Sequence, residues 1–313
     1  DPLVEYVPTS HVGVEIGNPV GLHYHYGTLG QLQHGENYAD AYLRTLGKLE
    51  TPKRKLMKWP YGKGKKVKLF VLAGHRNMEG ERAFVQDLKE IKGRGDLLKD
   101  NHSIAYKYSL GGGYKKSDDW EPFGVVDYYD SFGPELSLVH ELQGELSENM
   151  AIAKYTHSGS QIIDWTPEGS MAQDRHIYPE FLSFVKKSIE ELEAKGNAVE
   201  LTGIFYHVGE NDMSFHPYRK EAAKRIKAIV EQSRKDLGLP KLRWFLSQQL
   251  PTDVERLNSL DVMGDVAKLA DADPHVIHVK ALGLPPQEKR LVIRADGILA
   301  LGELIAKAYL GER

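Results

Sequence analysis

Cysteine is absent from this sequence of 313 residues. Its absence excludes disulfide bonds and a thiol nucleophile, and it leaves the redox compartment of the protein open. The chain also lacks an apolar run long enough to cross a bilayer, and it lacks the pattern of a signal peptide. The sequence therefore predicts no membrane-embedded part and no membrane partner.

A strong charge of either sign is also missing. The chain has 41 lysines and arginines against 44 aspartates and glutamates, a formal net charge of −3. Nucleic-acid-binding proteins usually carry a basic field, so this balance argues against a nucleic-acid partner. Lysines do gather between Lys53 and Lys68, but Pro52, Pro60 and Gly62 interrupt the run. That pattern predicts a solvated linker rather than a phosphate-binding patch.

The composition that remains is that of a globular protein. Hydrophobic residues make up 41% of the chain, and the mean hydropathy is −0.44. A chain of this length suits one large domain, or one domain with an appendage. We expect an N-terminal extension over residues 1–50, a linker over 51–66 and an α/β domain over 67–313.

The stretch Val67–Arg82 organises the domain. A run rich in β-branched and aromatic residues ends at Gly74, and a helical pattern follows a second glycine. A buried strand that turns sharply into a helix is typical of the first unit of an open α/β sheet. In such sheets ligands bind outside the carboxyl ends of the strands, so His75, Arg76 and Asn77 lie at the mouth of the predicted site.

Apolar runs predict four further strands. The five predicted strands cover residues 67–73, 150–155, 201–207, 243–249 and 275–279. Residues 93–130 are expected to be rich in loops, because glycines and charged residues cluster there. Together with the helical patterns between the strands, this predicts an α/β fold, a three-layer α/β/α sandwich with a mostly parallel, roughly five-stranded sheet.

The first turn resembles the nucleophile block of SGNH-type hydrolases, specifically the sialate O-acetylesterase-like carbohydrate esterases. That block reads Gly-Gln-Ser-Asn-Met, commonly with Glu-Gly after it, whereas this chain reads Gly-His-Arg-Asn-Met-Glu-Gly over Gly74–Gly80. Arg76 therefore stands where the family has its nucleophilic serine. A guanidinium stays protonated and cannot attack an acyl carbon, so the resemblance implies the fold but not the family's chemistry.

Further blocks carry the same resemblance along the rest of the chain. Phe132–Glu135 reads Phe-Gly-Pro-Glu like a family block, and Gly159 stands where the family has an oxyanion-hole backbone donor. His207–Glu210 resembles the family's His-Gln-Gly-Glu, with valine in place of glutamine. The family's Asp-x-x-His block is missing, because its two positions fall near Lys289 and Val292.

The N-terminal segment has an unusual motif of its own. Its Tyr-His-Tyr turn, which contains His25, resembles a family turn that carries the triad histidine before the last helix. An apolar stripe accompanies this turn, and we expect it to pack on the main domain because it is too apolar to leave in water. The stripe contains Leu22, Tyr24, Tyr26, Leu29, Tyr38, Tyr42 and Leu46. The alternative is an extension with aromatic packing and no role in the site.

Ionisable side chains follow three of the predicted strands, and a doubly wound sheet brings such strand ends together. The candidates for catalysis are Arg76, His157, His207 and Glu210, and those for substrate binding are His25, His75, Asn77, Ser158, Gly159 and Asp212. Each residue alone is more often scaffold than site. Their position on blocks that the family uses for its site favours a functional role.

We favour a repurposed enzyme of glycosidase or lyase type that acts on an acidic polysaccharide or oligosaccharide. Arg76 would bind a sugar carboxylate or sulfate, and His157, His207 or Glu210 would transfer a proton. In the opposing interpretation, Glu79 or Glu210 neutralises Arg76, and the pair only braces the loop.

Three other hypotheses stay open. The protein could be a carbohydrate-binding pseudoesterase, or an esterase that uses Ser158 with His25 or His157. A metal site of His75, His157 and His207 is the third, although no ligand spacing supports it and no cofactor is predicted. The family resemblance also implies a secreted or periplasmic protein.

Overall fold

The computed structural model describes most of the chain. The described residues are 14–17, 23–26, 28–49, 55–113, 115–126, 131–171, 176–209, 211–212, 216–248, 262–281, 284 and 292–311. Within these ranges, no helix is both long enough and apolar enough to span a membrane.

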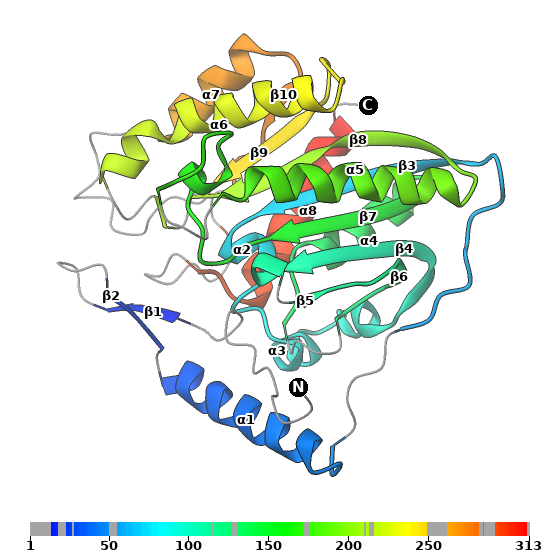
Figure 1. Ribbon diagram of the computed structural model, residues 1–313, viewed down its shortest axis with the longest axis vertical. Coiled ribbons are helices and arrows are strands. Elements are labelled where there is room, and N and C mark those ends of the chain that lie inside the picture. Colours follow the sequence, from blue (N-terminus) through cyan, green and yellow to red (C-terminus); the bar gives the residue numbers. More distant parts are fainter. Residues whose placement is uncertain are drawn as a thin grey trace.

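Strand β3 (Lys66–Gly74) is the central strand of the main sheet (Figure 1). It pairs in parallel with β7 (Asn149–Thr156) on one side and with β8 (Ala198–Val208) on the other. Beyond β8, strands β9 (Trp244–Gln248) and β10 (Val276–His278) continue the parallel order. These are the five predicted strands, and the prediction that they are parallel neighbours is confirmed.

The sheet is larger than predicted. Strand β4 (Asn101–Leu110) pairs in parallel with β7, and β5 (Lys115–Lys116) and β6 (Glu121–Phe123) pair antiparallel with β4. The described sheet therefore has eight strands rather than about five, and the expectation of loops over 93–130 is wrong there. The sequence hides β4 because Lys107 interrupts its apolar run. That lysine is buried and pairs with Glu191, which lies 84 residues further along the chain.

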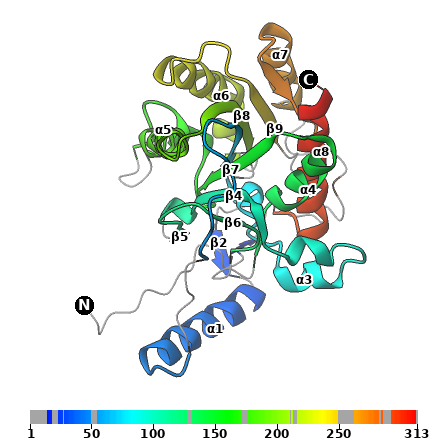
Figure 2. The ribbon, with the colours of Figure 1, turned by 90° about the vertical axis from the view of Figure 1, so that its right-hand side faces the viewer.

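Helices cover both faces of the sheet, as β3 requires. Its side chains alternate between two buried clusters, so each face needs its own apolar layer. Val67, Leu69, Val71 and Ala73 belong to one cluster, and Phe70 and Leu72 belong to the other. Figure 2 shows the sheet between its two helical layers. This arrangement confirms the predicted three-layer α/β/α fold.

The layer that covers Val67 and its neighbours contains α5 (Tyr178–Ala194), α6 (His216–Asp236) and α7 (Val262–Ala272). The opposite layer contains α3 (Val85–Glu90), α4 (Glu135–Glu145) and α8 (Ala295–Gly311). Helix α7 has no counterpart among the predicted elements. Short helices complete the domain: α2 (Arg76–Glu79), η1 (Gly95–Leu98), η2 (Gly111–Gly113) and η3 (Ile162–Trp165).

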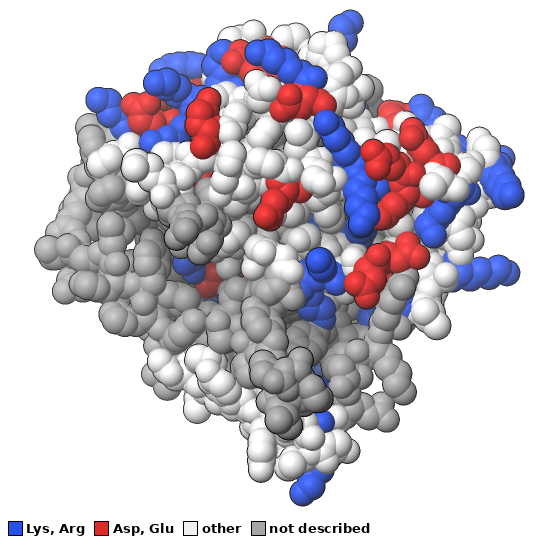
Figure 3. All heavy atoms as spheres, viewed as in Figure 1, with Lys and Arg blue, Asp and Glu red and all other residues white. Residues whose placement is uncertain are grey.

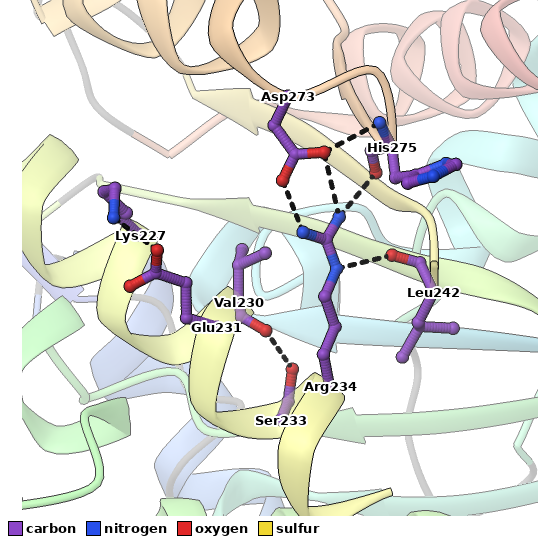
Figure 4. Close-up of polar contacts among 8 residues, drawn as sticks. All are labelled: Lys227, Val230, Glu231, Ser233, Arg234, Leu242, Asp273 and His275. Atoms are coloured by element: carbon purple, nitrogen blue, oxygen red, sulfur yellow. Dashed lines mark hydrogen bonds and ion pairs between the residues drawn. The ribbon is translucent and has the colours of Figure 1, made fainter. Parts of the chain in front are cut away.

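The end of α6 is fastened to the edge of the sheet by Arg234 (Figure 4). Its Nε donates to the carbonyl of Leu242 at 2.9 Å, and its Nη2 donates to that of His275 at 3.1 Å. The same guanidinium forms an ion pair with Asp273. Burial would raise the pKa of Asp273, but the hydrogen bonds from Arg234 and the His275 amide outweigh it, and the pKa is lowered. The junction thus joins α6 to β9 and β10.

Charged side chains are mixed over the face shown in Figure 3, where lysines and arginines are interspersed with aspartates and glutamates. Ion pairs between neighbouring turns of a helix, such as Lys227–Glu231 and Lys187–Glu191, also occur in the molecule. The pattern agrees with the small net charge of the chain.

The N-terminal segment forms a hairpin of β1 (Val14–Gly17) and β2 (His23–Tyr26), followed by α1 (Thr28–Thr45). In both ribbon views α1 lies outside the three layers (Figures 1 and 2). Tyr38 and Tyr42 are 56% and 64% exposed. The expectation that these two are covered is wrong, because no described element lies over them. Packing of residues 1–50 as a whole on the main domain stays a prediction.

Candidate functional site

The ends of three strands are joined by backbone hydrogen bonds. The His75 amide donates to the His207 carbonyl at 3.2 Å, and the His157 amide donates to the Gly74 carbonyl at 3.1 Å. Gly74 has a φ of +149°, and a Cβ there would lie 2.0 Å from the His207 oxygen. Only glycine allows this approach, so the sequence Ala-Gly-His sets the close contact of the strand ends. The predicted convergence of the three exits is confirmed.

Arg76 is buried at the start of α2 and holds an ion pair. Its Nη1 lies 2.8 Å from both carboxylate oxygens of Glu81, and its Nε donates to Asn211 Oδ1 at 3.1 Å. The neutralising carboxylate is therefore Glu81, and not Glu79 as the sequence suggested; Glu210 lies outside the described residues. The guanidinium charge is compensated inside the protein, which weakens the case for an anion clamp.

Asn77 connects α2 to the segment before the last helix. Its Oδ1 accepts a hydrogen bond from the Ile293 amide at 2.9 Å, and its side chain is fully buried. The neighbouring Val292 is also buried, at the position where the resemblance places the triad histidine. Lys289, at the aspartate position, lies outside the described residues. The hydrogen bond between Asn77 and Ile293 thus ties the segment before α8 to α2.

His75 and His207 are both fully buried. Burial lowers the pKa of His75 well below its usual range, and the electrostatic interactions of the ring with His157, His207 and Arg76 lower it further. Burial alone lowers the pKa of His207 to about 3. The Nδ1 atom of His207 lies 2.8 Å from Ser247 Oγ. These values make both rings weak bases at neutral pH.

The loop after β7 is held by hydrogen bonds to its own backbone carbonyls. Ser160 Oγ donates to the His157 carbonyl at 2.6 Å, and Asn211 Nδ2 donates to the Ser160 carbonyl at 2.8 Å. The half-buried ring of His157 packs against Gly112, where a Cβ would come within 2.8 Å of it. Of the other predicted residues here, Ser158 is buried, and a Cβ added at Gly159 would lie 3.9 Å from His157 Cε1, which is an ordinary contact distance.

Asp212 is a buried carboxyl that contacts the same loop. The Ile162 amide donates to its two oxygens at 3.2 and 3.1 Å. Burial nevertheless raises the pKa of Asp212 to about 7. Of the remaining candidates, Glu210 lies outside the described residues, and the side chain of His25 does too. The structure therefore brings together eight of the ten candidates and leaves these two without a description.

Glu79 is a residue that the sequence analysis did not place in the site. Its Oε2 accepts hydrogen bonds from Thr156 Oγ1 at 2.9 Å and from the Gly111 amide at 3.0 Å. Its Oε1 is buried and has no hydrogen-bond partner among the described residues. Burial raises the pKa of Glu79 to about 7, with Glu81 adding to the effect. The Glu-Gly that follows Asn-Met was the available signal, but it does not reveal the burial.

A second buried ion pair, between Lys154 and Glu135, contacts the end of α2. Lys154 Nζ donates to Glu135 Oε2 at 2.7 Å and to the Glu79 carbonyl at 3.1 Å. Glu135 also accepts from the Gly133 amide at 3.1 Å. Lys154 thus ties the Phe-Gly-Pro-Glu block to the end of α2.

A metal centre is not found in this part of the molecule. Among the residues that the structure describes, no group of three or more histidine, aspartate or glutamate side chains is arranged to hold a metal ion. The hypothesis of a metal site from His75, His157 and His207 is therefore not supported.

Comparison with known proteins gives one family. A family model described as carbohydrate esterase, sialic acid-specific acetylesterase, matches residues 66–311. The match begins at the first residue of β3 and ends at the last residue of α8. Residues 1–65 lie outside it. A search of curated protein sequences finds no significant match.

Solved structures share the fold at low sequence identity. A protein from Arabidopsis thaliana is 20% identical with a TM-score of 0.60, over 78% of this chain and 98% of that one. A carbohydrate acetylesterase from Xanthomonas citri is 14% identical with a TM-score of 0.54, over 77% of this chain and 55% of that one. NanS is 15% identical with a TM-score of 0.50, over 74% and 81%. These similarities show the fold.

Proposed function

The chain belongs to the carbohydrate esterase family of sialic acid-specific acetylesterases, and we propose that it binds carbohydrate at the strand ends without serine-esterase turnover. The Arg76–Glu81 ion pair is the observation that carries the proposal. Arg76 stands at the position of the nucleophile, and a guanidinium cannot form an acyl intermediate. Its donors are directed at Glu81 and Asn211, which fixes the turn in place.

Carbohydrate as the ligand class is inferred from the family. The Xanthomonas citri protein, which shares the fold, is described as a carbohydrate acetylesterase. The preference for an acidic sugar that the sequence suggested has less support, because Glu81 compensates the charge of Arg76. A neutral sugar fits the geometry better.

A displaced esterase triad of Ser158 with His25 or His157 is the less favoured alternative, and a pairing of Ser247 with His207 is no better supported. His207 and Ser247 do lie within hydrogen-bond distance, but both are buried, and a histidine with a pKa of about 3 is a poor general base. Val292 offers no base at the position where the family places its histidine. Neither observation favours an activated serine.

A second candidate function rests on the two buried carboxyls. Glu79 and Asp212 each have a pKa raised to about 7, so each is able to exchange a proton near neutral pH. This favours the repurposed glycosidase or lyase over an esterase if the protein is an enzyme. Proton transfer would then come from these carboxyls rather than from His207.

One screen separates these functions. The protein is incubated with neutral and acidic oligosaccharides, with and without acetyl groups, while acetate, reducing ends and unsaturated products are measured alongside binding heat. The proposal predicts heat without product. Acetate release that Ser158→Ala abolishes would establish the displaced triad. New reducing ends or unsaturated sugars, lost in Glu79→Gln or Asp212→Asn, would instead establish the acid–base enzyme.

A further inference from the structure

A pocket of about 360 Å³ opens between α3 and the start of α8, outside the strand-end site. Its volume falls in the range of small-molecule sites, roughly 300–1,000 Å³. Its lining combines two guanidinium groups, three carboxylates and three apolar side chains. These residues are Arg82, Phe84, Asp87, Glu90, Ile91, Arg294, Ala295 and Asp296.

The walls of this pocket are held together by backbone pairing. Arg82 and Arg294 form a parallel β-bridge, so the segment before α3 and the segment before α8 are fixed side by side. The same C-terminal segment is bonded through Ile293 to Asn77 in α2. Arg294 is two residues from Val292, so their Cα atoms lie at most about 7 Å apart. The pocket therefore adjoins the position of the family's missing histidine.

The chemistry of the lining selects against a strongly charged ligand. An anion that approaches Arg82 or Arg294 also meets the carboxylates of Asp87, Glu90 and Asp296. An ammonium group in the pocket is likewise repelled by the two guanidinium groups. The summed charge of the lining is only −1, from two positive and three negative side chains, so neither sign is favoured strongly.

A polyhydroxylated ring suits this lining. Each hydroxyl both donates and accepts, so it can donate to a carboxylate and accept from a guanidinium. Phe84 and Ile91 supply apolar surface for the C–H face of such a ring. We propose that the pocket binds a neutral pyranose unit and serves as a sugar subsite beside the strand ends. The choice of sugar as ligand class rests on the proposed function.

The test measures binding of methyl β-D-galactopyranoside and methyl β-D-xylopyranoside to the whole chain by calorimetry, with methyl β-D-glucuronide as the charged probe. Asp296→Asn should weaken binding of a neutral glycoside roughly tenfold or more, because it removes a charged acceptor. Phe84→Leu should weaken it about two- to tenfold. Asp271→Asn, an exposed carboxylate on α7, is the matched control and should leave binding unchanged. Melting curves confirm that each variant is folded.

The outcomes separate this inference from the proposed function. If the glycosides bind and neither pocket variant weakens them, while Arg76→Met does, the pocket inference fails and the strand-end site stands. If the pocket variants abolish binding and Arg76→Met has no effect, the pocket stands and the strand-end site fails. Tighter binding of the glucuronide than of both neutral glycosides overturns the neutral-sugar assignment. Absence of binding by all three probes overturns both.

Discussion

Two arginines in different parts of the molecule make similar contacts but sit in different surroundings. Arg76, at the strand ends, donates to Glu81 and to a side-chain amide. Arg234, at the end of α6, donates to Asp273 and to two backbone carbonyls. The carboxylate side chain of Glu81 is 1% exposed, whereas that of Asp273 is 31% exposed.

The difference shows what each ion pair does. Arg234 connects three segments of backbone, and water can still reach its partner, so the pair acts as part of the framework. The pair of Arg76 and Glu81 lies where water cannot solvate either charge once the other is removed. The same contact is therefore expected to cost far more to break at the strand ends than at the α6 junction.

The largest effect is predicted for Glu81→Gln. The amide keeps the size of the side chain but removes the negative charge that lies 2.8 Å from the buried guanidinium of Arg76. Removal of one partner from a buried pair typically lowers the free energy of unfolding by about 3–5 kcal/mol. Urea denaturation with linear extrapolation measures it. A loss below about 1 kcal/mol would mean that Arg76 has another compensating partner or access to water.

The second prediction concerns pH, and its sign differs between the two regions. The folded pKa of Glu79 is raised by burial from 4.5 to about 7, so its contribution to stability is present below about pH 4.5 and is lost as the pH rises to about 7. Asp273 has a lowered pKa, so its contribution is present above its unfolded pKa and is lost as the pH falls.

Glu79→Gln tests this difference at the strand ends. The amide imitates the protonated acid, so the variant should gain stability relative to wild type as the pH rises from about 4.5 to 7, on the order of 3 kcal/mol in all. The comparison with wild type is needed because His75 and His207 also titrate. Their pKa values are lowered in the folded state, so their contribution to the stability of the protein is lost as the pH falls. Denaturation curves at several pH values measure the gain. An equal offset at every pH would show that Glu79 does not titrate in this window.

The third prediction is the counterpart of the first at the α6 junction. Asp273→Asn makes the same change from carboxylate to amide, but it leaves Arg234 with two backbone carbonyl partners. Because the site is partly exposed, we expect a loss of only about 0.5–1.5 kcal/mol. The same urea experiment measures it. A loss equal to that of Glu81→Gln would remove the proposed distinction between the two pairs.

The sequence predicts the framework better than the site, for reasons visible in single residues. The central strands are predictable because apolar runs such as 67–73 are buried on both faces, which a pattern records directly. Strand β4 is not predictable in this way, because a lysine such as Lys107 is typical of a surface position. Its partner Glu191 lies in a helix that is distant in the sequence, so the pattern does not indicate that Lys107 is buried.

The candidate site shows the same limit. The motif around Gly74 locates the strand ends, and the presence of Arg76 in that motif is visible in the sequence itself. The identity of its partner is not. Glu81 is chosen over Glu79 by the path of the chain after α2, and the raised pKa of Glu79 comes from burial. Contacts that depend on the path of a turn are not encoded in residue spacing.

The smallest effect is predicted for Lys227→Met, which sets the baseline for the other pairs. Lys227 forms an i,i+4 ion pair with Glu231 on the same helix as Arg234 (Figure 4), and both side chains are more than half exposed. Methionine keeps the length and helix propensity of lysine, so the change isolates the charge. We expect a loss of about 0.3–0.5 kcal/mol, which falls further as salt is added. Urea denaturation at low and high ionic strength measures both quantities. A loss of free energy of unfolding as large as that of Asp273→Asn would indicate that the stability of α6 depends on surface charge. The degree of burial of an ion pair would then not explain the difference between Arg76 and Arg234.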